Sequence, residues 1–402
     1  MRSRTLIRLG VALAAIALVS AACGTDDDEA ADTTAAPVTI AAPATTAAPA
    51  TTAPPADEPE PEPEGMSASD ITAAFILVGP VGDAGWNWAH DQGRIFAEEQ
   101  TGATTLVVES IPENAEAFKE VAVDFIRNEG ANIIFGTSFG YMDPMEELAA
   151  EYPDVVFEHA SGFKMNDTNF GNFFGRMYQP RYLSGMAAGA MTQSGQIGYV
   201  AAFPIPEVIR GINAFTLGVR ETNPSAEVHV NWTFTWFDPA VEGDTASALL
   251  EAGADVIAMH QDSTAAGVAA QDAGARWVAY NSDMRNFAPE AFITAPVWHW
   301  GPRYARTIEA VAAGTYTPGA YWGGMDDGIV QLAELSADVP GDIADRIADA
   351  AEQIRSGGWD VFTGPINDQD GAERVAAGET MEDGPMLGMD WFVEGVVGDA
   401  SP

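Results

Sequence analysis

The segment Ile71–Arg94, ITAAFILVGPVGDAGWNWAHDQGR, places a run of apolar residues directly before a glycine-containing turn and a polar, periodic stretch. The apolar run 71–78 is continuous rather than alternating, which is typical of a strand buried on both faces of a parallel sheet. The stretch after the turn has the spacing of a helix that reaches Gln100. The segment therefore predicts a strand that passes into a helix, the basic unit of an α/β fold.

The same succession of strand and helix recurs along the chain. Further apolar runs, each followed by a turn or a helical pattern, lie at 104–110, 132–138, 155–161, 197–203, 227–236, 255–261 and 276–282. The rhythm restarts after Gly195, which indicates two α/β units of similar size. The remaining segments are too few for a third core, so we expect them to return to both units. Repeated crossing between two Rossmann-like parallel-sheet lobes implies a hinge with a cleft.

These patterns set the expected domain boundaries. Lobe 1 covers 70–195 and is completed by part of 291–320, whereas lobe 2 covers 196–290 and is completed by part of 321–365. Residues 366–402 form an extension that returns to the lobes.

The first 69 residues have the pattern of a targeting segment and a tether. Three arginines precede the apolar run 9–22, which is too short to span a bilayer, so 1–22 reads as a signal peptide. Cys23, the single cysteine, follows directly and is the expected lipidation site. Ser20 departs from the usual aliphatic residue of a lipobox, so a secreted protein without lipid stays an alternative. Residues 23–69, rich in Ala, Thr, Pro and Glu, predict a disordered tether to the membrane.

The charge excludes one class of partner. The net charge is −41, and Lys119 and Lys164 are the only lysines, which argues against binding to nucleic acid. No later segment offers about 18 unbroken apolar residues, so we expect no transmembrane helix.

Polar and aromatic residues cluster where the predicted strands end, which is where open parallel sheets bind ligands. The expected ligand-binding residues are Asp83, Trp86, Asn87, Trp88, Asp91, Phe139, Phe163, Phe203, Glu207, Trp236, Asn281, Asp283 and Trp298. Ser138, Tyr141, Asp238, Gln261, Asp262, His299 and Trp300 also follow strands. Aromatic faces with amide and carboxylate groups suit a flat heteroaromatic ligand, and they suit a sugar almost as well.

Several of these residues have a structural alternative. Asp83 and Asp238 each precede a helix and could cap it. Trp86 and Trp88 point about 200° apart on a helix, so only one of them can face a ligand, and we expect it to be Trp86. His90 and Asp91 lie one turn further on and could simply be solvated.

Enzyme signatures are sparse. The five histidines lack the spacing of a metal site and there is no phosphate-binding loop, so we predict no metal and no cofactor. Residues 136–140, GTSFG, match the GxSxG pattern of serine hydrolases, with Asp262, Asp283 and His299 following in hydrolase order. A pattern this short arises easily in a chain with 40 glycines, so we expect no enzyme and keep hydrolysis as a remote alternative.

Longer matches carry a resemblance to a known family. The segments DAGWNWAHDQG (83–93), NIIFGTSFG (132–140), IGYVAAFPIPEVIRGINAFTLGVR (197–220), WFDP (236–239), GADVI (253–257) and MDWFVEGVVG (389–398) resemble the basic membrane protein family of ABC-transporter substrate-binding lipoproteins. The resemblance implies a type I periplasmic-binding-protein fold with three hinge crossings. It also implies a monomer, lipid-anchored at the extracytoplasmic face of the cell membrane, that delivers a small ligand to an ABC permease with its nucleotide-binding subunits.

The resemblance also guides the choice of ligand. Family members that bind purine nucleosides hold ribose hydroxyls with an aspartate and a lysine, whereas this chain has Asn281 and Trp298 at the matching places. Losing both groups removes hydrogen bonds that a ribose needs. We therefore predict a free purine base such as adenine, stacked on Trp86 and Phe139, with Asn87, Asp83 and Asn281 at its edges. A nucleoside, another flat heterocycle and a role as ligand sensor stay open.

Overall fold

A computed structural model describes residues 66–402. The predicted signal peptide, the lipidation of Cys23 and the tether up to residue 65 lie outside the described residues. The last residues assigned to the tether contribute to a short 3-10 helix, η1, over Ala68–Asp70. Within 66–402, no helix combines the length and the apolar character needed to cross a membrane.

Lobe 1 is built on a six-stranded sheet in the order β12-β5-β4-β3-β1-β2, with every pairing parallel. Its strands are β1 (Thr72–Ile76), β2 (Thr104–Val108), β3 (Ile133–Gly136), β4 (Val156–Ala160), β5 (Phe170–Gly175) and β12 (Ala320–Gly323). Its helices are α1 (Trp86–Thr101), α2 (Ala115–Arg127), α3 (Met142–Glu151) and α8 (Gly301–Ala312), with the 3-10 turns η2 (Val81–Asp83) and η3 (Phe139–Tyr141). The continuous apolar runs of β1 and β3 are buried, whereas β2 at the edge is partly exposed.

Lobe 2 is built on a second parallel sheet in the order β10-β9-β8-β6-β7-β16. Its strands are β6 (Gln196–Ala201), β7 (Glu227–Trp232), β8 (Val256–His260), β9 (Arg276–Val278), β10 (Phe292–Thr294) and β16 (Val396–Val397). Its helices are α4 (Tyr178–Met191), α5 (Pro206–Thr222), α6 (Pro239–Glu251), α7 (Ala265–Asp272), α9 (Gly341–Arg355) and α10 (Asp383–Leu387). Asp238 caps α6 by accepting hydrogen bonds from the amides of Ala240 and Val241, as its structural alternative predicted.

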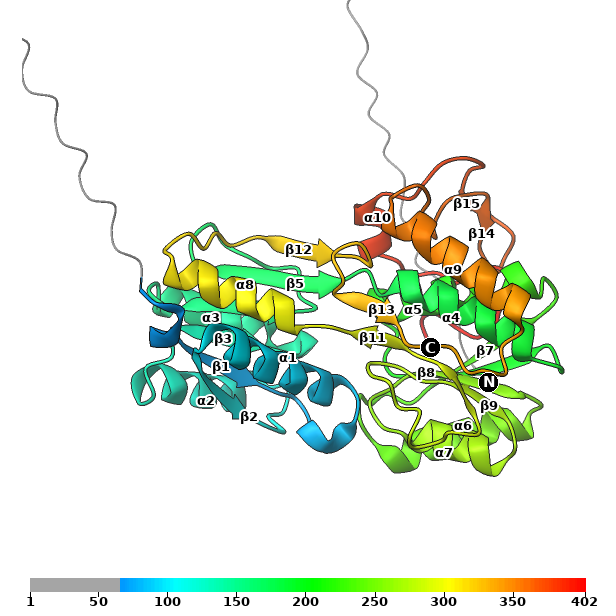
Figure 1. Cartoon of the computed structure of the whole chain (residues 1–402), viewed down its shortest axis with the longest axis horizontal. Coiled ribbons are helices and arrows are strands. Elements are labelled where there is room, and N and C mark those ends of the chain that lie inside the picture. Colours follow the sequence, from blue (N-terminus) through cyan, green and yellow to red (C-terminus); the bar gives the residue numbers. More distant parts are fainter. Residues whose placement is uncertain (1–65) are drawn as a thin grey trace, which may run out of the picture. The chain divides into compact units, whose positions relative to one another are not determined.

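The chain passes between the lobes three times: after β5, between β10 and α8, and after β12. Two of the crossings pair with each other, because β11 (Pro296–Trp298) runs antiparallel to β13 (Val330–Leu332) (Figure 1). The prediction of two parallel-sheet lobes with three hinge crossings is confirmed.

The boundaries inside the lobes differ from those expected. Helix α4 falls in the segment assigned to lobe 1, yet it packs against α5 of lobe 2. A side chain at Gly185 would meet the Phe215 carbonyl at 2.0 Å, and one at Gly218 would meet the Tyr182 carbonyl at 1.9 Å, so these glycines let the two helices touch. Part of 291–320 was expected to complete lobe 1, and α8 and the start of β12 do so, whereas β10 joins the sheet of lobe 2. The short strands β14 (Ile366–Asn367) and β15 (Glu373–Val375) form a separate pair.

Candidate functional site

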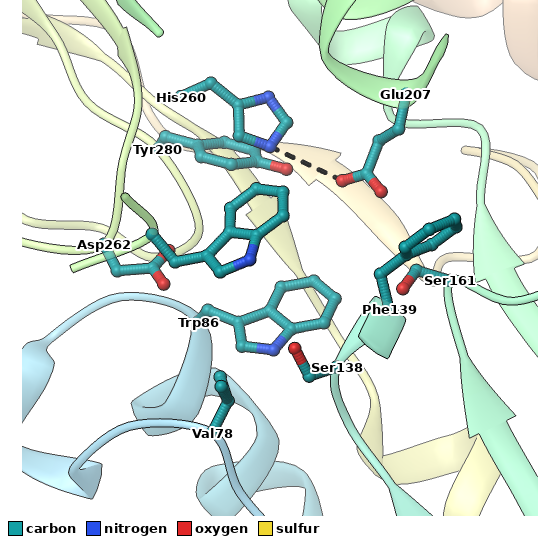
Figure 2. Close-up of a pocket in the computed structure, with 10 residues that line it drawn as sticks. Val78, Trp86, Ser138, Phe139, Ser161, Glu207, His260, Asp262 and Tyr280 are labelled. Carbon is teal, nitrogen blue, oxygen red and sulfur yellow. Dashed lines mark ion pairs between the residues drawn. The ribbon is translucent and has the colours of Figure 1, made fainter. Parts of the chain in front are cut away.

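A small pocket lies between the lobes, at the carboxyl ends of several strands (Figure 2). Both lobes supply its walls. The residues from lobe 1 are Val78, Trp86, Ser138, Phe139 and Ser161, and those from lobe 2 are Glu207, Trp236, His260, Asp262 and Tyr280. Three indole or phenyl rings and two carboxyl groups therefore face one small space.

The ring of Trp86 is fixed in orientation by its surroundings. Its Nε1 donates a hydrogen bond to the Thr137 carbonyl at 2.6 Å. Trp298 and Trp300 meet it edge-to-face at centroid distances of 5.8 and 5.6 Å, and they stack on each other at 4.4 Å. A ring held in this way can present a flat face to a ligand without losing side-chain freedom on binding.

The two carboxyl groups come from lobe 2. Asp262 follows β8 and is only 5% exposed, and burial raises the pKa of its carboxyl well above the usual range, helped by the nearby Asp83 and Glu242 carboxyls. Glu207 lies in the first turn of α5, and its Oε1 lies 3.4 Å from Nε2 of His260 (Figure 2). Burial lowers the pKa of His260, which keeps the imidazole neutral near pH 7.

Asn281 and Trp298 do not line the pocket, and their polar groups bond within the protein. The Asn281 amide donates to Oδ1 of Asp262 at 2.9 Å, and its Oδ1 accepts a hydrogen bond from the Trp298 indole at 3.0 Å. The Asn281 backbone has a φ of 69°, a left-handed conformation that asparagine tolerates well. The structure thus gives Asn281 a positioning role, since it holds the Asp262 carboxyl toward the pocket.

Asp83 and Asn87 build the loop that carries Trp86. The Asp83 carboxylate accepts hydrogen bonds from the backbone amides of Gly85, Asn87 and Trp88, which is the capping role given as its alternative. The Asn87 side chain is fully buried, donates to Asp83 and accepts from the Gly79 amide. Both side chains are satisfied within the loop, and neither lines the pocket.

The other expected residues divide between the rim and the surface. Trp88 and Phe163 are 40% and 70% exposed, Phe203 packs on Trp236 with centroids 4.9 Å apart, and none of them lines the pocket. Asp91 and Asp283 pair with arginines of their own neighbourhoods, Arg94 and Arg285. His90 is buried, stacks on Trp300 and shares a hydrogen bond with Tyr304.

Six lining residues were absent from the expected set: Val78, Ser138, Ser161, His260, Asp262 and Tyr280. Ser138 and Asp262 had been noted after their strands without being placed among the expected ligand-binding residues, and Tyr280 directly adjoins Asn281, which was. Which of two adjacent side chains points into a cleft depends on the local twist of the backbone. The sequence periodicity at a strand end is too short to report that twist.

The lobes touch directly beside the pocket. The backbone of Gly85 in lobe 1 lies so close to Asp262 in lobe 2 that an added Cβ would stand 2.3 Å from the Asp262 carbonyl oxygen. The Ser282 hydroxyl also donates a hydrogen bond to the Ala84 carbonyl across the cleft. These contacts describe a closed arrangement in which both walls are brought together.

The GxSxG segment is arranged differently from a hydrolase nucleophile. The Ser138 hydroxyl donates to Oε1 of Glu113 at 2.5 Å, and the nearby His159 ring bonds to the Ser138 backbone carbonyl. A serine nucleophile needs its hydroxyl to donate to a general base such as histidine. Within 66–402, no group of three or more His, Cys, Asp or Glu side chains is placed to hold a metal ion.

Comparisons with known proteins agree with this geometry. The profile of the Bmp family, described as PnrA-like ABC transporter substrate-binding protein, matches residues 71–357. A purine-binding protein of Brucella abortus is 42% identical over 328 residues, covering 81% of this chain and 93% of that protein. A protein of Haloferax volcanii described as a candidate ABC transporter glucose-binding protein is 41% identical over 335 residues. The match covers 82% of this chain and 81% of that protein.

Solved structures support the fold. A solute-binding protein of an ABC transporter from Aeropyrum pernix superposes with a TM-score of 0.64 at 18% identity, covering 74% of this chain and 93% of that one. A solute-binding protein of an ABC transporter from Conexibacter woesei superposes with a TM-score of 0.61 at 21% identity. The match covers 72% of this chain and 98% of that one. At these identities the likeness speaks for the type I periplasmic-binding-protein architecture alone.

Proposed function

Because this chain belongs to the Bmp family of PnrA-like ABC transporter substrate-binding proteins, we propose that it binds an adenine-like purine nucleobase between its lobes and delivers it to an ABC permease. The single observation that carries the choice of ligand is the pocket itself. It combines the faces of Trp86, Phe139 and Trp236 with the carboxyls of Asp262 and Glu207.

The pocket is narrow in this arrangement, because its walls from the two lobes meet around it. A bare heterocycle has less bulk than a nucleoside, so we propose that it lies in this space with its faces against aromatic rings. Its ring nitrogens and amino group then meet carboxyl groups at the edge, which suits the hydrogen-bonding capacity of a purine.

The surroundings of Asn281 and Trp298 count against a nucleoside. The Asn281 amide is engaged with Asp262 and Trp298, and the Trp298 indole has Asn281 as its partner. Neither side chain is free to hold a ribose hydroxyl. Sugar hydroxyls left unpaired in a closed cleft would cost about 1–3 kcal/mol each.

Glucose is the second candidate, because the Haloferax volcanii relative carries that description at nearly the same identity as the purine-binding relative. Aromatic faces also pack on pyranose rings. A sugar needs hydrogen-bond partners around its whole edge, however, and most of the pocket lining here is aromatic or already paired within the protein.

The extracytoplasmic setting follows from the family, since ABC substrate-binding proteins work outside the cytoplasm. We further propose that the protein acts as a monomer that the lipid-modified Cys23 anchors to the membrane, next to its permease and nucleotide-binding subunits. Binding of the ligand shifts the lobes to the closed state, which the permease recognises. Cys23→Ala should release the protein from the membrane fraction, whereas retention of that variant would argue against a lipid anchor.

Calorimetric titration with adenine, guanine, hypoxanthine, adenosine and glucose tests the choice of ligand. We expect adenine to bind most tightly and adenosine more weakly than the best free base. Tighter binding of adenosine than of every base would make the protein a nucleoside receptor. Binding of glucose alone would assign it to sugar transport.

A further inference from the structure

We propose that Asp262 binds the ligand as an un-ionised carboxylic acid and so selects a purine edge on which a hydrogen-bond acceptor and a donor lie side by side. The inference rests on the proposed function, because it assumes a purine in the pocket. It names the residue whose proton would take part in purine binding and predicts that binding depends on pH.

The position of the Asp262 carboxyl suits this role. The residue lines the pocket and is 5% exposed. Its Oδ1 accepts a hydrogen bond from the Asn281 amide at 2.9 Å. The only hydrogen bond that the carboxyl makes among residues 66–402 is the one to Oδ1, which leaves Oδ2 and the second lone pair of Oδ1 for a ligand.

The groups around Asp262 are mostly acidic. Asp83 of η2, Glu242 of α6 and Glu207 of α5 all act on it as like charges. Glu242 is itself held by the amide and hydroxyl of Ser263, and Asp83 by the start of α1. No ion pair joins Asp262 to a basic side chain within the described chain.

The cationic and neutral groups on the same side form no ion pair with Asp262 within the described chain. The Arg181 guanidinium packs 3.7 Å from the centroid of the Tyr280 ring and donates through Nη1 to the Met259 carbonyl, while its Nε and Nη2 have no hydrogen-bond partner among residues 66–402. His260 faces Glu207, and its burial lowers its pKa. Burial also raises the pKa of the Tyr280 hydroxyl, so it stays protonated. A carboxylate at Asp262 would therefore lie buried among like charges, and protonation removes that repulsion.

The protonation state decides which purine edge fits. A carboxylic acid offers one donor and one acceptor, whereas a carboxylate offers acceptors only. Adenine carries an acceptor, N7, beside a donor, its amino group, so the acid makes two complementary hydrogen bonds with it. The N7 edge of guanine carries two acceptors, N7 and O6, and can use only the donor of the acid, whereas its O6 and N1–H lie side by side and match the acid as adenine does. A carboxylate would instead pair with the edge of guanine that carries two donors.

Closure of the two lobes links the protonation of Asp262 to ligand binding. Asp83 belongs to lobe 1 and Asp262 to lobe 2, and they are brought together where Gly85 touches Asp262. Opening of the lobes separates the two carboxyls and hydrates Asp262, which lowers its pKa. Closing on adenine therefore takes up a proton from solvent. Affinity is highest below the pKa of the open form and declines as the pH rises through the higher pKa of the closed form.

Titration calorimetry of the full chain with adenine and guanine tests the inference. The titrations run from about pH 5.5 to about pH 8.5, in buffers of different ionisation enthalpy that report the number of protons taken up. We expect uptake of up to about one proton per adenine bound, and an affinity that falls by up to about tenfold per pH unit at the alkaline end. The Asp262→Asn variant keeps a donor and an acceptor, so it should bind adenine without the pH dependence. Asp283→Asn, an exposed carboxylate paired with Arg285, is the matched control and should keep the wild-type dependence.

Adenine binding that is independent of pH and takes up no proton would overturn the inference, as would an adenine affinity that rises with pH. Both results would leave purine binding intact. Failure of every purine to bind at any pH would overturn the proposed function and this inference with it. Where circular dichroism shows that Asp262→Asn does not fold, the proton count of the wild-type protein decides the question.

Discussion

Gly85→Ala should weaken ligand binding by blocking closure while leaving each lobe folded. The new Cβ would stand 2.3 Å from the Asp262 carbonyl oxygen and 2.9 Å from the Asp262 carbonyl carbon and Cα. Those are backbone atoms of the opposite lobe, so no change of side-chain rotamer relieves the contact. Ordinary contact begins near 3.4 Å, so the lobes must separate by about 1 Å at this point.

Overpacking of this kind costs about 1–3 kcal/mol, which corresponds to a dissociation constant raised by about 5- to 150-fold. The open form avoids the contact, so the thermal midpoint of the ligand-free protein should change little. Calorimetry gives the affinity, and small-angle scattering with and without ligand reports the extent of closure. Gly82→Ala is the matched control, because an added Cβ there meets nothing within 4 Å. Equal affinity of the two variants would refute closure through this contact.

Two further substitutions test the pocket wall and the core of lobe 1. Trp86→Ala removes the fixed stacking face, so we expect it to lose about 1–3 kcal/mol of binding free energy in the same titration. An unchanged dissociation constant would show that Trp86 does not belong to the site. Arg303→Met should lower the free energy of unfolding by about 3–5 kcal/mol in urea, because it leaves the buried Glu158 carboxyl without its ion pair. Arg306→Met breaks a longer, exposed pair with Asp327 and should cost no more than about 1 kcal/mol, so equal losses would contradict the argument.

The fold could be predicted from the sequence because its strands are buried on both faces. Continuous apolar runs such as 71–78 and 197–203 mark strands of a parallel sheet, and their number and order imply two lobes. The assignment of α4 and β10 could not be predicted in the same way. Whether an element after a crossing packs on one lobe or the other depends on contacts between distant segments, such as those made by Gly185 and Gly218.

The sequence indicates the region of the fold in which the pocket lies, but it indicates the individual lining residues less well. Trp86, Phe139, Glu207 and Trp236 line the pocket, since each follows a strand at its carboxyl end, and their contact with a ligand stays a prediction. Asn281 and Asp83 have the residue types of ligand partners, yet their polar atoms are engaged within the protein. Sequence shows that a polar group is present near a strand end. Only the arrangement of its neighbours shows whether that group still has hydrogen-bonding capacity to spare.

The pairing of β16 with β7 has a consequence for the order in which the chain folds. Val396 and Val397 align with Val228 and His229, so the outer strand of the lobe 2 sheet comes from a segment far along the chain. Contacts this distant in sequence carry a large loop-closure entropy and tend to form late. Until β16 docks, β7 is left as an open sheet edge, and such edges template association between chains. A folding intermediate without β16 would thus be the species most exposed to aggregation.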